Sequence, residues 1–211
     1  MSTASDASFW DRSSQKYAKS PISDQAGYEC TLERTRALLK PDDRVLELGC
    51  GTGTTALRLA SEVESYLATD ISSGMIAIAE EKRTASPIAG LAFRAATAEA
   101  LASEPARFDA VLGFNYLHLV RDLPGTLRSI HTLLAPGGLF ISKTACLGDM
   151  NLLIRLALPL ARAIGKAPYV SVFRAPDLKQ LISAAGFEIL NTESHASRGK
   201  DSRPFIMARR N

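Results

Sequence analysis

The sequence predicts a three-layer α/β/α sandwich around a seven-stranded, mostly parallel β-sheet. Short apolar runs alternate with segments in which apolar residues recur at helical spacing, a pattern typical of parallel strands joined by helices. A glycine-rich turn at residues 49–53 separates the first such strand from its helix. With 211 residues, of which 46% are hydrophobic, the chain can bury one substantial core, so we expect one main domain.

Each element follows from a local pattern. Proline cannot continue a helix, so the first core helix should end at Lys40-Pro41, and Ser72 or Ser73 can cap the third. Gly186 should close the last helix. The expected helices are 28–39, 56–63, 73–83, 123–134 and 176–185. The expected strands are 45–48, 66–69, 91–95, 108–113, 139–144, 187–190 and 204–208.

Composition excludes several classes of protein. The net charge is only +3, from 25 basic and 22 acidic residues. This is not the excess of basic residues that is typical of proteins that bind nucleic acid or an acidic membrane surface. Cys30, Cys50 and Cys146 show neither pairing nor metal-ligand spacing, so we expect reduced thiols, a cytoplasmic location and no metal. The N-terminus lacks the pattern of an export signal, and no apolar run is long enough to span a membrane.

The glycine-rich turn indicates a ligand site. Glycines at 49, 51 and 53 lie between an apolar strand and a helix. Such a turn directs free N–H groups toward a ligand, which can approach the backbone without meeting a Cβ atom. A glycine-rich connection without a ligand is the alternative.

Asp70 supports the ligand hypothesis. It follows the second apolar run, 21 positions after Gly49, where an acid can accept hydrogen bonds from both hydroxyls of a ribose. A dinucleotide fingerprint would have a glycine where Thr54 stands, and a phosphate loop would end in Gly-Lys-Ser/Thr, which is absent. We therefore expect a nucleoside rather than a phosphate ligand.

The motif pair at 47–53 and 69–72, Glu-Leu-Gly-Cys-Gly-Thr-Gly and Thr-Asp-Ile-Ser, resembles the cofactor site of class I S-adenosylmethionine-dependent methyltransferases. The likeness runs from about residue 40 to the C-terminus. It implies a Rossmann-like fold, a final antiparallel hairpin and S-adenosylmethionine as cofactor. The cofactor-binding residues implied are Tyr17, Glu47, Gly49, Cys50, Gly51, Gly53, Asp70, Ile71, Met75, Thr97, Ala98 and Asn115.

In the family picture, Ile71 and Met75 form the apolar wall against adenine, although both also suit the core. The family commonly places Asp or Asn at the position of Thr97, to accept a hydrogen bond from the adenine amino group. This sequence departs from that pattern. A hydroxyl can still accept, and the backbone N–H of Ala98 can face a ring nitrogen.

Residues 1–23 are expected to form an N-terminal segment before the methyltransferase domain at 24–211. Phe9, Trp10 and Tyr17 fit one face of a short helix, which either packs on the domain or folds over the site. In many family members this segment covers the cofactor. Tyr17 and Lys19 are then candidates to meet its carboxylate.

Methyl transfer is an in-line displacement that requires alignment and exclusion of water, but neither a metal nor a covalent intermediate. A general base helps some acceptors, and His118 is the candidate because its loop follows a buried strand and faces the crevice. His131 and His195 are expected farther away. Asn115-Tyr116-Leu117 lacks the prolines found there in enzymes that methylate DNA amino groups, so a DNA acceptor is disfavoured.

The segment at 148–172 is more apolar than one buried helix face requires. Three interpretations compete: a lid over the substrate, which we favour, a dimer surface, or peripheral membrane contact through 150–165. The expected function is methylation of a small molecule. The alternatives are a non-catalytic nucleoside-binding or interaction domain of the same fold, and a membrane-surface lipid or quinone methyltransferase.

Overall fold

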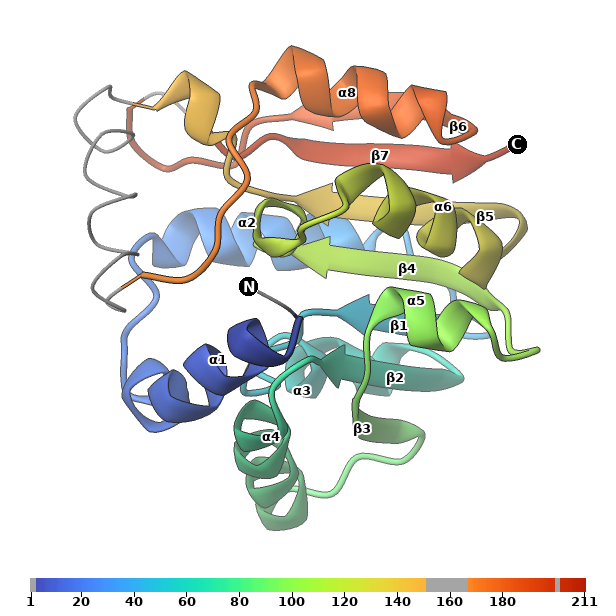
Figure 1. Ribbon diagram of the computed structural model, residues 1–211. Coiled ribbons are helices and arrows are strands. Elements are labelled where there is room, and N and C mark those ends of the chain that lie inside the picture. Colours follow the sequence, from blue (N-terminus) through green and yellow to red (C-terminus); the bar gives the residue numbers. More distant parts are fainter. Residues whose placement is uncertain (1–2, 151–166, 200–201) are drawn as a thin grey trace.

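The structure, a computed structural model, describes residues 3–150, 167–199 and 202–211. Seven strands form one sheet in the order β3-β2-β1-β4-β5-β7-β6 (Figure 1). The strands are β1 (Arg44–Leu48), β2 (Ser65–Asp70), β3 (Leu91–Ala95), β4 (Phe108–Phe114), β5 (Leu134–Lys143), β6 (Phe187–Glu193) and β7 (Phe205–Arg210). β1 pairs in parallel with both β2 and β4, so it is an inner strand of the sheet, and the glycine turn follows its carboxyl end.

β7 runs antiparallel to its neighbours, β5 and β6, whereas the pairs from β3 to β5 are parallel. The predicted mostly parallel, seven-stranded sheet and the closing antiparallel hairpin are therefore confirmed. β5 begins earlier than predicted, because Leu134 pairs with Phe108 before the register shifts around the Pro136-Gly137-Gly138 turn.

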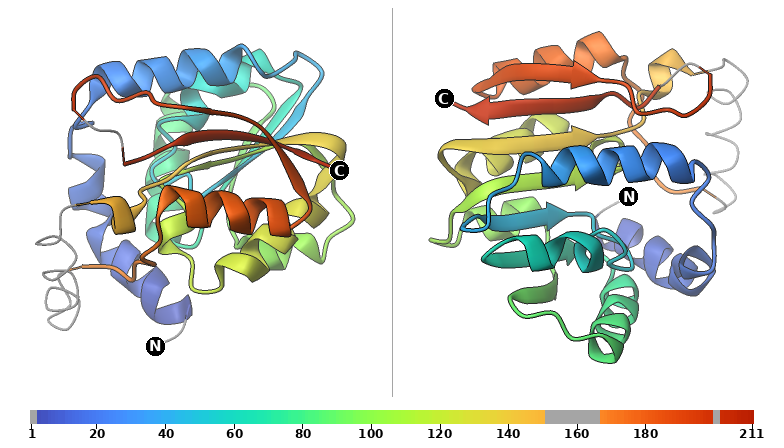
Figure 2. Two further views of the ribbon diagram at one scale, coloured as in Figure 1. Left: turned by 90° about the horizontal axis from the view of Figure 1, so that it is seen from above. Right: turned by 180° about the vertical axis from the view of Figure 1, so that it is seen from behind.

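Helices cover both faces of the sheet (Figure 2). One face carries α2 (Gln25–Arg36), α3 (Ala56–Leu59) and α4 (Ser73–Ala85), and the other carries α5 (Ala98–Ala102), α6 (Leu123–Leu133) and α8 (Ala175–Ala184). Side chains of β1 alternate between the two cores: Val45 belongs to the first, Leu46 and Leu48 to the second. The layers thus follow the period of two along a strand.

Caps define where several helices begin. Asp24, Ser72 and Asp122 accept hydrogen bonds from backbone N–H groups in the first turns of α2, α4 and α6. Ser72, rather than Ser73, is therefore the cap of α4. The helix after the glycine turn is shorter than predicted, because α3 ends at Leu59 and one 3₁₀ turn (Ala60–Glu62) follows.

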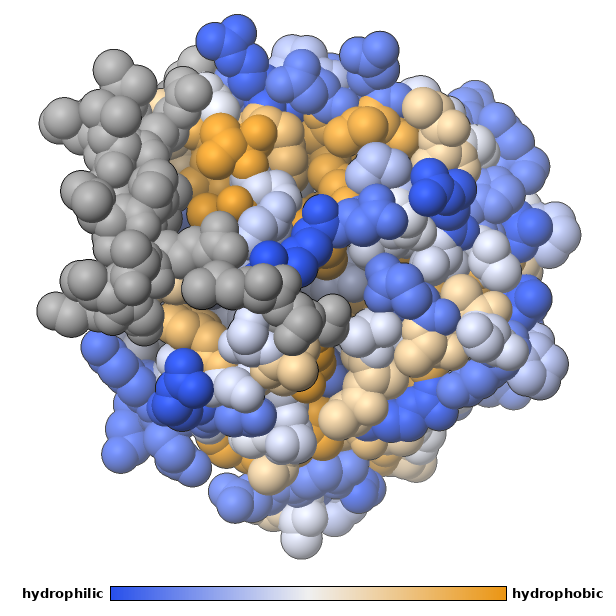
Figure 3. Space-filling view, viewed as in Figure 1, coloured by the Kyte–Doolittle hydropathy of each residue, from blue (hydrophilic) through white to orange (hydrophobic). Residues whose placement is uncertain are grey.

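Helix α1 (Thr3–Ala18) lies beside the carboxyl ends of β1 and β2 and packs on α4 (Figure 1). In the face shown in Figure 3, apolar side chains gather beside α8, and Val172, on the segment that leads into α8, is 53% exposed. Most of the predicted lid falls at 151–166, outside the described residues. Among the helices that the structure describes, none is long and apolar enough to cross a membrane.

Gly53→Ala should destabilise the protein. Gly53 has φ +75°, and a Cβ atom there would lie 2.7 Å from the Phe93 ring and 2.9 Å from Ala79. Left-handed backbone costs a non-glycine residue roughly 1–2 kcal/mol, and overpacking adds about 1–3 kcal/mol. Gly137→Ala is the control, because Gly137 has the same φ but no atom within 4 Å of such a Cβ. Equal losses of free energy of unfolding in urea would contradict the packing argument.

Candidate functional site

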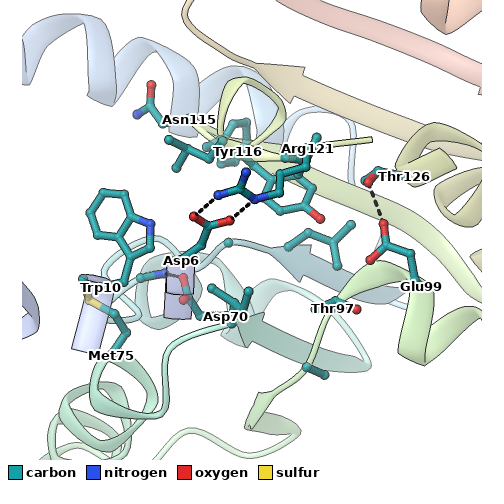
Figure 4. Close-up of a pocket in the computed structure, with 18 of the residues that line it drawn as sticks. Asp6, Trp10, Asp70, Met75, Thr97, Glu99, Asn115, Tyr116, Arg121 and Thr126 are labelled. Carbon is teal, nitrogen blue, oxygen red and sulfur yellow. Dashed lines mark hydrogen bonds and ion pairs between the residues drawn. The ribbon is translucent and has the colours of Figure 1, made fainter. Parts of the chain in front are cut away.

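A cavity of about 420 Å³ lies at the carboxyl ends of β1, β2, β3 and β4, partly covered by α1 (Figure 4). It is lined by residues of α1, the glycine turn, the start of α4 and the segments after β3 and β4. Of the predicted site residues, it brings together Tyr17, Gly49, Gly51, Asp70, Ile71, Met75, Thr97 and Asn115. The crevice is where open parallel sheets commonly bind ligands.

Two tyrosine rings pack on the glycine turn. Gly49 (φ +70°) faces the ring of Tyr116, which a Cβ atom would approach to 2.7 Å. A Cβ atom at Gly51 (φ +54°) would lie 3.4 Å from Tyr17, in ordinary van der Waals contact. Both positions have positive φ, which glycine adopts without the strain that other residues incur.

Asp70 ties the turn to the next helix. Its Oδ2 accepts the N–H of Gly51 at 3.0 Å, and its Oδ1 accepts the N–H of Ser72 at 2.9 Å. Burial raises the pKa of Asp70, while the backbone donors at Ser72, Gly51 and Ile71 oppose that rise. The carboxylate lines the cavity and has lone pairs beyond those that the two N–H groups use.

Glu47 is buried, and its Oε2 accepts the hydroxyl of Tyr66 at 2.9 Å. Burial raises the pKa of Glu47 to about 7; the bond from Tyr66 opposes this rise and the charge of Asp70 adds to it. With Cys50, Glu47 lines a second cavity of about 830 Å³. The two cavities share Tyr17, Gly49, Phe114 and Asn115 as lining residues.

Asn115 stands where the two cavities meet. It has φ +51°, the one non-glycine residue with positive φ among the described residues. Asn tolerates this region better than most side chains. Its N–H donates to the carbonyl of Lys143 at 2.7 Å, which holds the end of β4 against β5.

Four candidates line neither cavity: Gly53, Ala98, His118 and Lys19. Gly53 packs on Phe93, and Ala98 is fully buried. The Nδ1 of His118 is hydrogen-bonded to Thr144 Oγ1 at 2.9 Å. Burial, with a smaller contribution from Arg203, lowers the pKa of His118 to about 4, so its ring is neutral at neutral pH.

The cavity also includes residues that the sequence analysis did not select: Asp6, Trp10, Glu99, Tyr116, Arg121 and Thr126. Asp6 in α1 accepts two hydrogen bonds from Arg121, at 2.6 and 2.7 Å, across the cavity (Figure 4). The guanidinium of Arg121 also lies 4.3 Å from the centre of the Tyr169 ring. The spacing of Asp6 and Arg121 in the chain carries no signal of this contact.

A second acid, Asp11, fixes α1 to α4. Its Oδ1 accepts hydrogen bonds from Ser72 Oγ at 2.6 Å and from the N–H of Gly74 at 2.9 Å. These bonds lower the pKa of Asp11. Helix α1 is thus attached on both sides of the cavity. In residues 3–150, 167–199 and 202–211, no group of three His, Cys, Asp or Glu side chains is placed to hold a metal.

Glu47→Gln should change how stability depends on pH. The pKa of Glu47 is raised in the folded state, so its contribution to stability is complete below pH ~4.5 and is lost as pH rises through about 7. Gln keeps an acceptor for Tyr66 and removes this loss. We expect Gln to gain about 2–3 kcal/mol relative to Glu between pH 5 and pH 8. Urea unfolding at both pH values measures it, and exposed Glu81→Gln is the control. A pH dependence unchanged by Glu47→Gln would contradict the assignment.

Asp6→Asn should loosen α1. It removes one charge of a partly buried ion pair, whose side chains are 17% and 27% exposed, so the loss of global stability should stay near or below about 1 kcal/mol. Amide hydrogen exchange in 3–18 should nevertheless accelerate. Asp109→Asn breaks an ion pair with Arg44 far from α1 and is the control. Equal exchange in both variants would show that Asp6 does not hold the helix.

The sequence of this chain is similar to those of known proteins. A family model described as "Methyltransferase domain" matches residues 23–192. The arginine-hydroxylase NDUFAF5 of Danio rerio is 38% identical over 154 residues, which cover 70% of this chain and 46% of that protein. The ubiquinone biosynthesis O-methyltransferase of Methylocella silvestris is 37% identical over 101 residues, which cover 48% and 39%. The chain thus spans less than half the length of these curated relatives.

A solved structure shows the same fold. Magnesium protoporphyrin IX methyltransferase from Synechocystis PCC 6803, with bound SAH, superposes with a TM-score of 0.71 at 19% identity, covering 98% of this chain and 95% of that one. Since the family model covers most of the sequence, this chain belongs to the methyltransferase domain family, with the fold of the class I S-adenosylmethionine-dependent enzymes.

Proposed function

We propose that this protein binds S-adenosylmethionine in the first cavity and transfers its methyl group to a small-molecule acceptor. One observation carries the proposal: Gly49 and Gly51 of the glycine turn and the carboxylate of Asp70, which accepts the N–H of Gly51, line one cavity that α1 partly covers. Membership of the methyltransferase domain family supports it.

The residues of the cavity fit such a cofactor. Asp70 can accept from both ribose hydroxyls, because each of its oxygens uses one lone pair for a backbone N–H. Ile71 and Met75 supply an apolar wall, and Tyr17 lies over Gly51. The carboxylate of Asp70 in this cavity, and that of Glu47 in the second, favour a cationic ligand. The dimensions also fit, since small-molecule sites commonly enclose roughly 300–1,000 Å³.

The bound cofactor would supply a methyl group on a sulfonium, which a nucleophile displaces in line. The protein's task is then alignment and exclusion of water. Helix α1, fixed through Asp6 and Asp11, closes one side of the cavity. We infer that the acceptor enters from the second cavity, which shares Gly49 and Asn115 with the first.

His118 is a secondary candidate for a general base. Its imidazole is neutral at neutral pH, as a base requires, but a pKa of about 4 makes it weak. It lines neither cavity. We therefore assign the transfer mainly to alignment, without a metal. A His118→Asn variant that loses kcat would restore the base assignment.

The relatives favour two further candidates. One relative is named an arginine-hydroxylase, so a domain that binds the cofactor without methyl transfer is the second candidate function. Another is named a ubiquinone biosynthesis O-methyltransferase, which favours a quinone or lipid acceptor. Contact of 150–165 with a membrane and formation of a homodimer stay predictions. A cytoplasmic location also stays a prediction, because the first relative is named mitochondrial.

A panel of acceptors separates these functions. Incubation with S-adenosylmethionine should yield S-adenosylhomocysteine only when a suitable acceptor is present, and the acceptor should gain one methylene by mass spectrometry. A gain of one oxygen instead would favour hydroxylation. Binding without any turnover across small phenols, quinones and amines would favour the non-catalytic candidate.

Asp70→Ala should weaken cofactor binding more than it alters the fold. Charge-assisted hydrogen bonds contribute about 1.5–3 kcal/mol each, so a loss of at least about tenfold in affinity is expected. The variant also leaves the N–H groups of Gly51 and Ser72 without this acceptor, so the thermal midpoint should fall.

Isothermal titration with S-adenosylhomocysteine and with NAD, beside thermal melting of the same sample, tests this prediction. The unaltered protein should bind the first ligand and not NAD. A lowered midpoint with unchanged affinity would show that Asp70 only supports the turn and the start of α4.

A further inference from the structure

Three cationic residues line the second cavity, and each comes from a different segment of the chain. Lys143 is the last residue of β5, Arg203 lies two residues before β7, and Arg198 follows β6. Because β7 is antiparallel to β5 and β6, its start lies at the same edge of the sheet as their carboxyl ends (Figure 1). The topology of the sheet thus brings three positive charges to one cavity.

Lys143 is the half-buried member of this group, and a buried network holds it. Its Nζ donates to Thr31 Oγ1 at 2.9 Å and to the carbonyl of Gly27 at 3.4 Å, both in α2. Thr31 Oγ1 is also hydrogen-bonded to Nδ1 of His195 at 3.1 Å, and both residues are buried. Nε2 of His195 lies 3.1 Å from Glu193 Oε2. Connected buried hydrogen bonds are rigid, so the ammonium has a fixed place at the wall of the cavity.

Two acids line the same cavity, but each is engaged elsewhere. Asp24 accepts hydrogen bonds from the N–H and hydroxyl of Ser197 and from the N–H of Gly27. These bonds, with a smaller contribution from the charge of Lys143, lower the pKa of Asp24 to about 2. Glu47 is buried, and burial raises its pKa to about 7. Among the described lining residues, cationic side chains therefore outnumber acids, which favours an anion in the cavity.

Lys143 lies closer to the expected place of an acceptor than to that of the cofactor. It pairs with Phe114 at the end of β4, and β4 separates β5 from β1. Neighbouring strands lie about 4.8 Å apart, so the backbone of Lys143 is roughly 10 Å from the glycine turn that follows β1. Its side chain reaches α2 rather than this turn. A group that binds here belongs to a molecule beside the cofactor, which is where an acceptor must lie for in-line transfer.

We propose that the acceptor is a small molecule with a carboxylate, and that Lys143, positioned by Thr31 and His195, binds this group. The exposed Arg198 and Arg203 add positive charge to the same cavity. The inference rests on the proposed function and names the class of its acceptor. A carboxylate carries one negative charge and only accepts hydrogen bonds, so it matches an ammonium. Their attraction is stronger in a partly desolvated cavity than in water, and a neutral amide of the same shape lacks it.

Isothermal titration with benzoate and 2-naphthoate, each beside its amide, tests the inference. The protein is saturated with S-adenosylhomocysteine, so that the place of the cofactor's own carboxylate is filled. The unaltered protein should prefer each carboxylate to its amide by about tenfold. Lys143→Gln should remove this preference and leave the affinity for the amides unchanged. Thr31→Val, which removes the hydroxyl that holds the ammonium at nearly the same volume, should narrow the preference by a smaller factor.

Lys82→Gln is the matched control. Lys82 is also partly buried and donates to the hydroxyl and the carbonyl of Thr52, but it lines neither cavity. It should keep the preference of the unaltered protein. Titration of each variant with S-adenosylhomocysteine alone shows that the variant is folded. A larger effect of Lys143→Gln on this affinity than on that for the carboxylates would assign Lys143 to the cofactor and overturn the inference.

Phenyl phosphate provides a second anion for comparison. Tighter binding of phenyl phosphate than of benzoate would overturn the choice of a carboxylate. Carboxylates that bind no better than their amides, in protein that does bind S-adenosylhomocysteine, would overturn this inference and leave the proposed function intact. A failure of the unaltered protein to bind S-adenosylhomocysteine would instead overturn the proposed function and, with it, this inference.

Discussion

The hydrogen bonds of one carboxylate, that of Asp70, hold together the parts on which the cavity depends. Its two oxygens accept the N–H groups of Gly51 and Ser72 and so join the glycine turn, the end of β2 and the start of α4. Burying an ionised carboxylate without hydrogen-bond donors costs free energy. The two N–H groups therefore stabilise the charged form of Asp70. The same group therefore shapes the turn and presents a negative charge to a ligand.

Burying the acids of the site costs free energy in the folded chain, and a ligand of positive charge can offset part of that cost. Glu47 and Asp70 are both desolvated, which raises the pKa of each, and burial together with the charges of both acids raises the pKa of Tyr17. A ligand with positive charge favours the ionised forms, which links binding to stability. Helix α1 completes the site through Asp6 and Asp11, two further acids whose partners belong to other elements. Such local departures from the most stable arrangement are expected at functional sites.

Neither the fold nor the family identifies the molecule that accepts the methyl group in the proposed reaction. The relatives carry names of different activities, and proteins of one fold commonly differ in chemistry because the reacting groups lie on variable segments. In this chain the second cavity is bounded by Lys143, the α1–α2 connection and the segment after β6. An acceptor in the proposed position would therefore meet these surroundings rather than the sheet.

Local patterns were enough to predict the order of the strands along the chain, the glycine turn and the place of Asp70 at the end of β2. Alternation in β1, the cap of α4 and the position of Asp70 each depend on residues within a few positions of one another, or on one strand following the next. Gly49, Gly51 and Asp70 line the first cavity, and their role in binding a cofactor stays a prediction. The bounds of α3 and β5 were less accurate, because packing and a register shift override local propensity there.

Tertiary structure alone revealed which side chains complete the cavity. Asp6 meets Arg121, 115 positions away, and Thr126 meets Glu99, 27 positions away, and neither pair has any periodic signature. His118 lies in the loop that the sequence indicated, yet its ring turns toward Thr144 and lines neither cavity. A pattern along the chain specifies which face of an element is buried. The direction of one side chain and its distance to a distant partner are set by packing between elements, which no local pattern encodes.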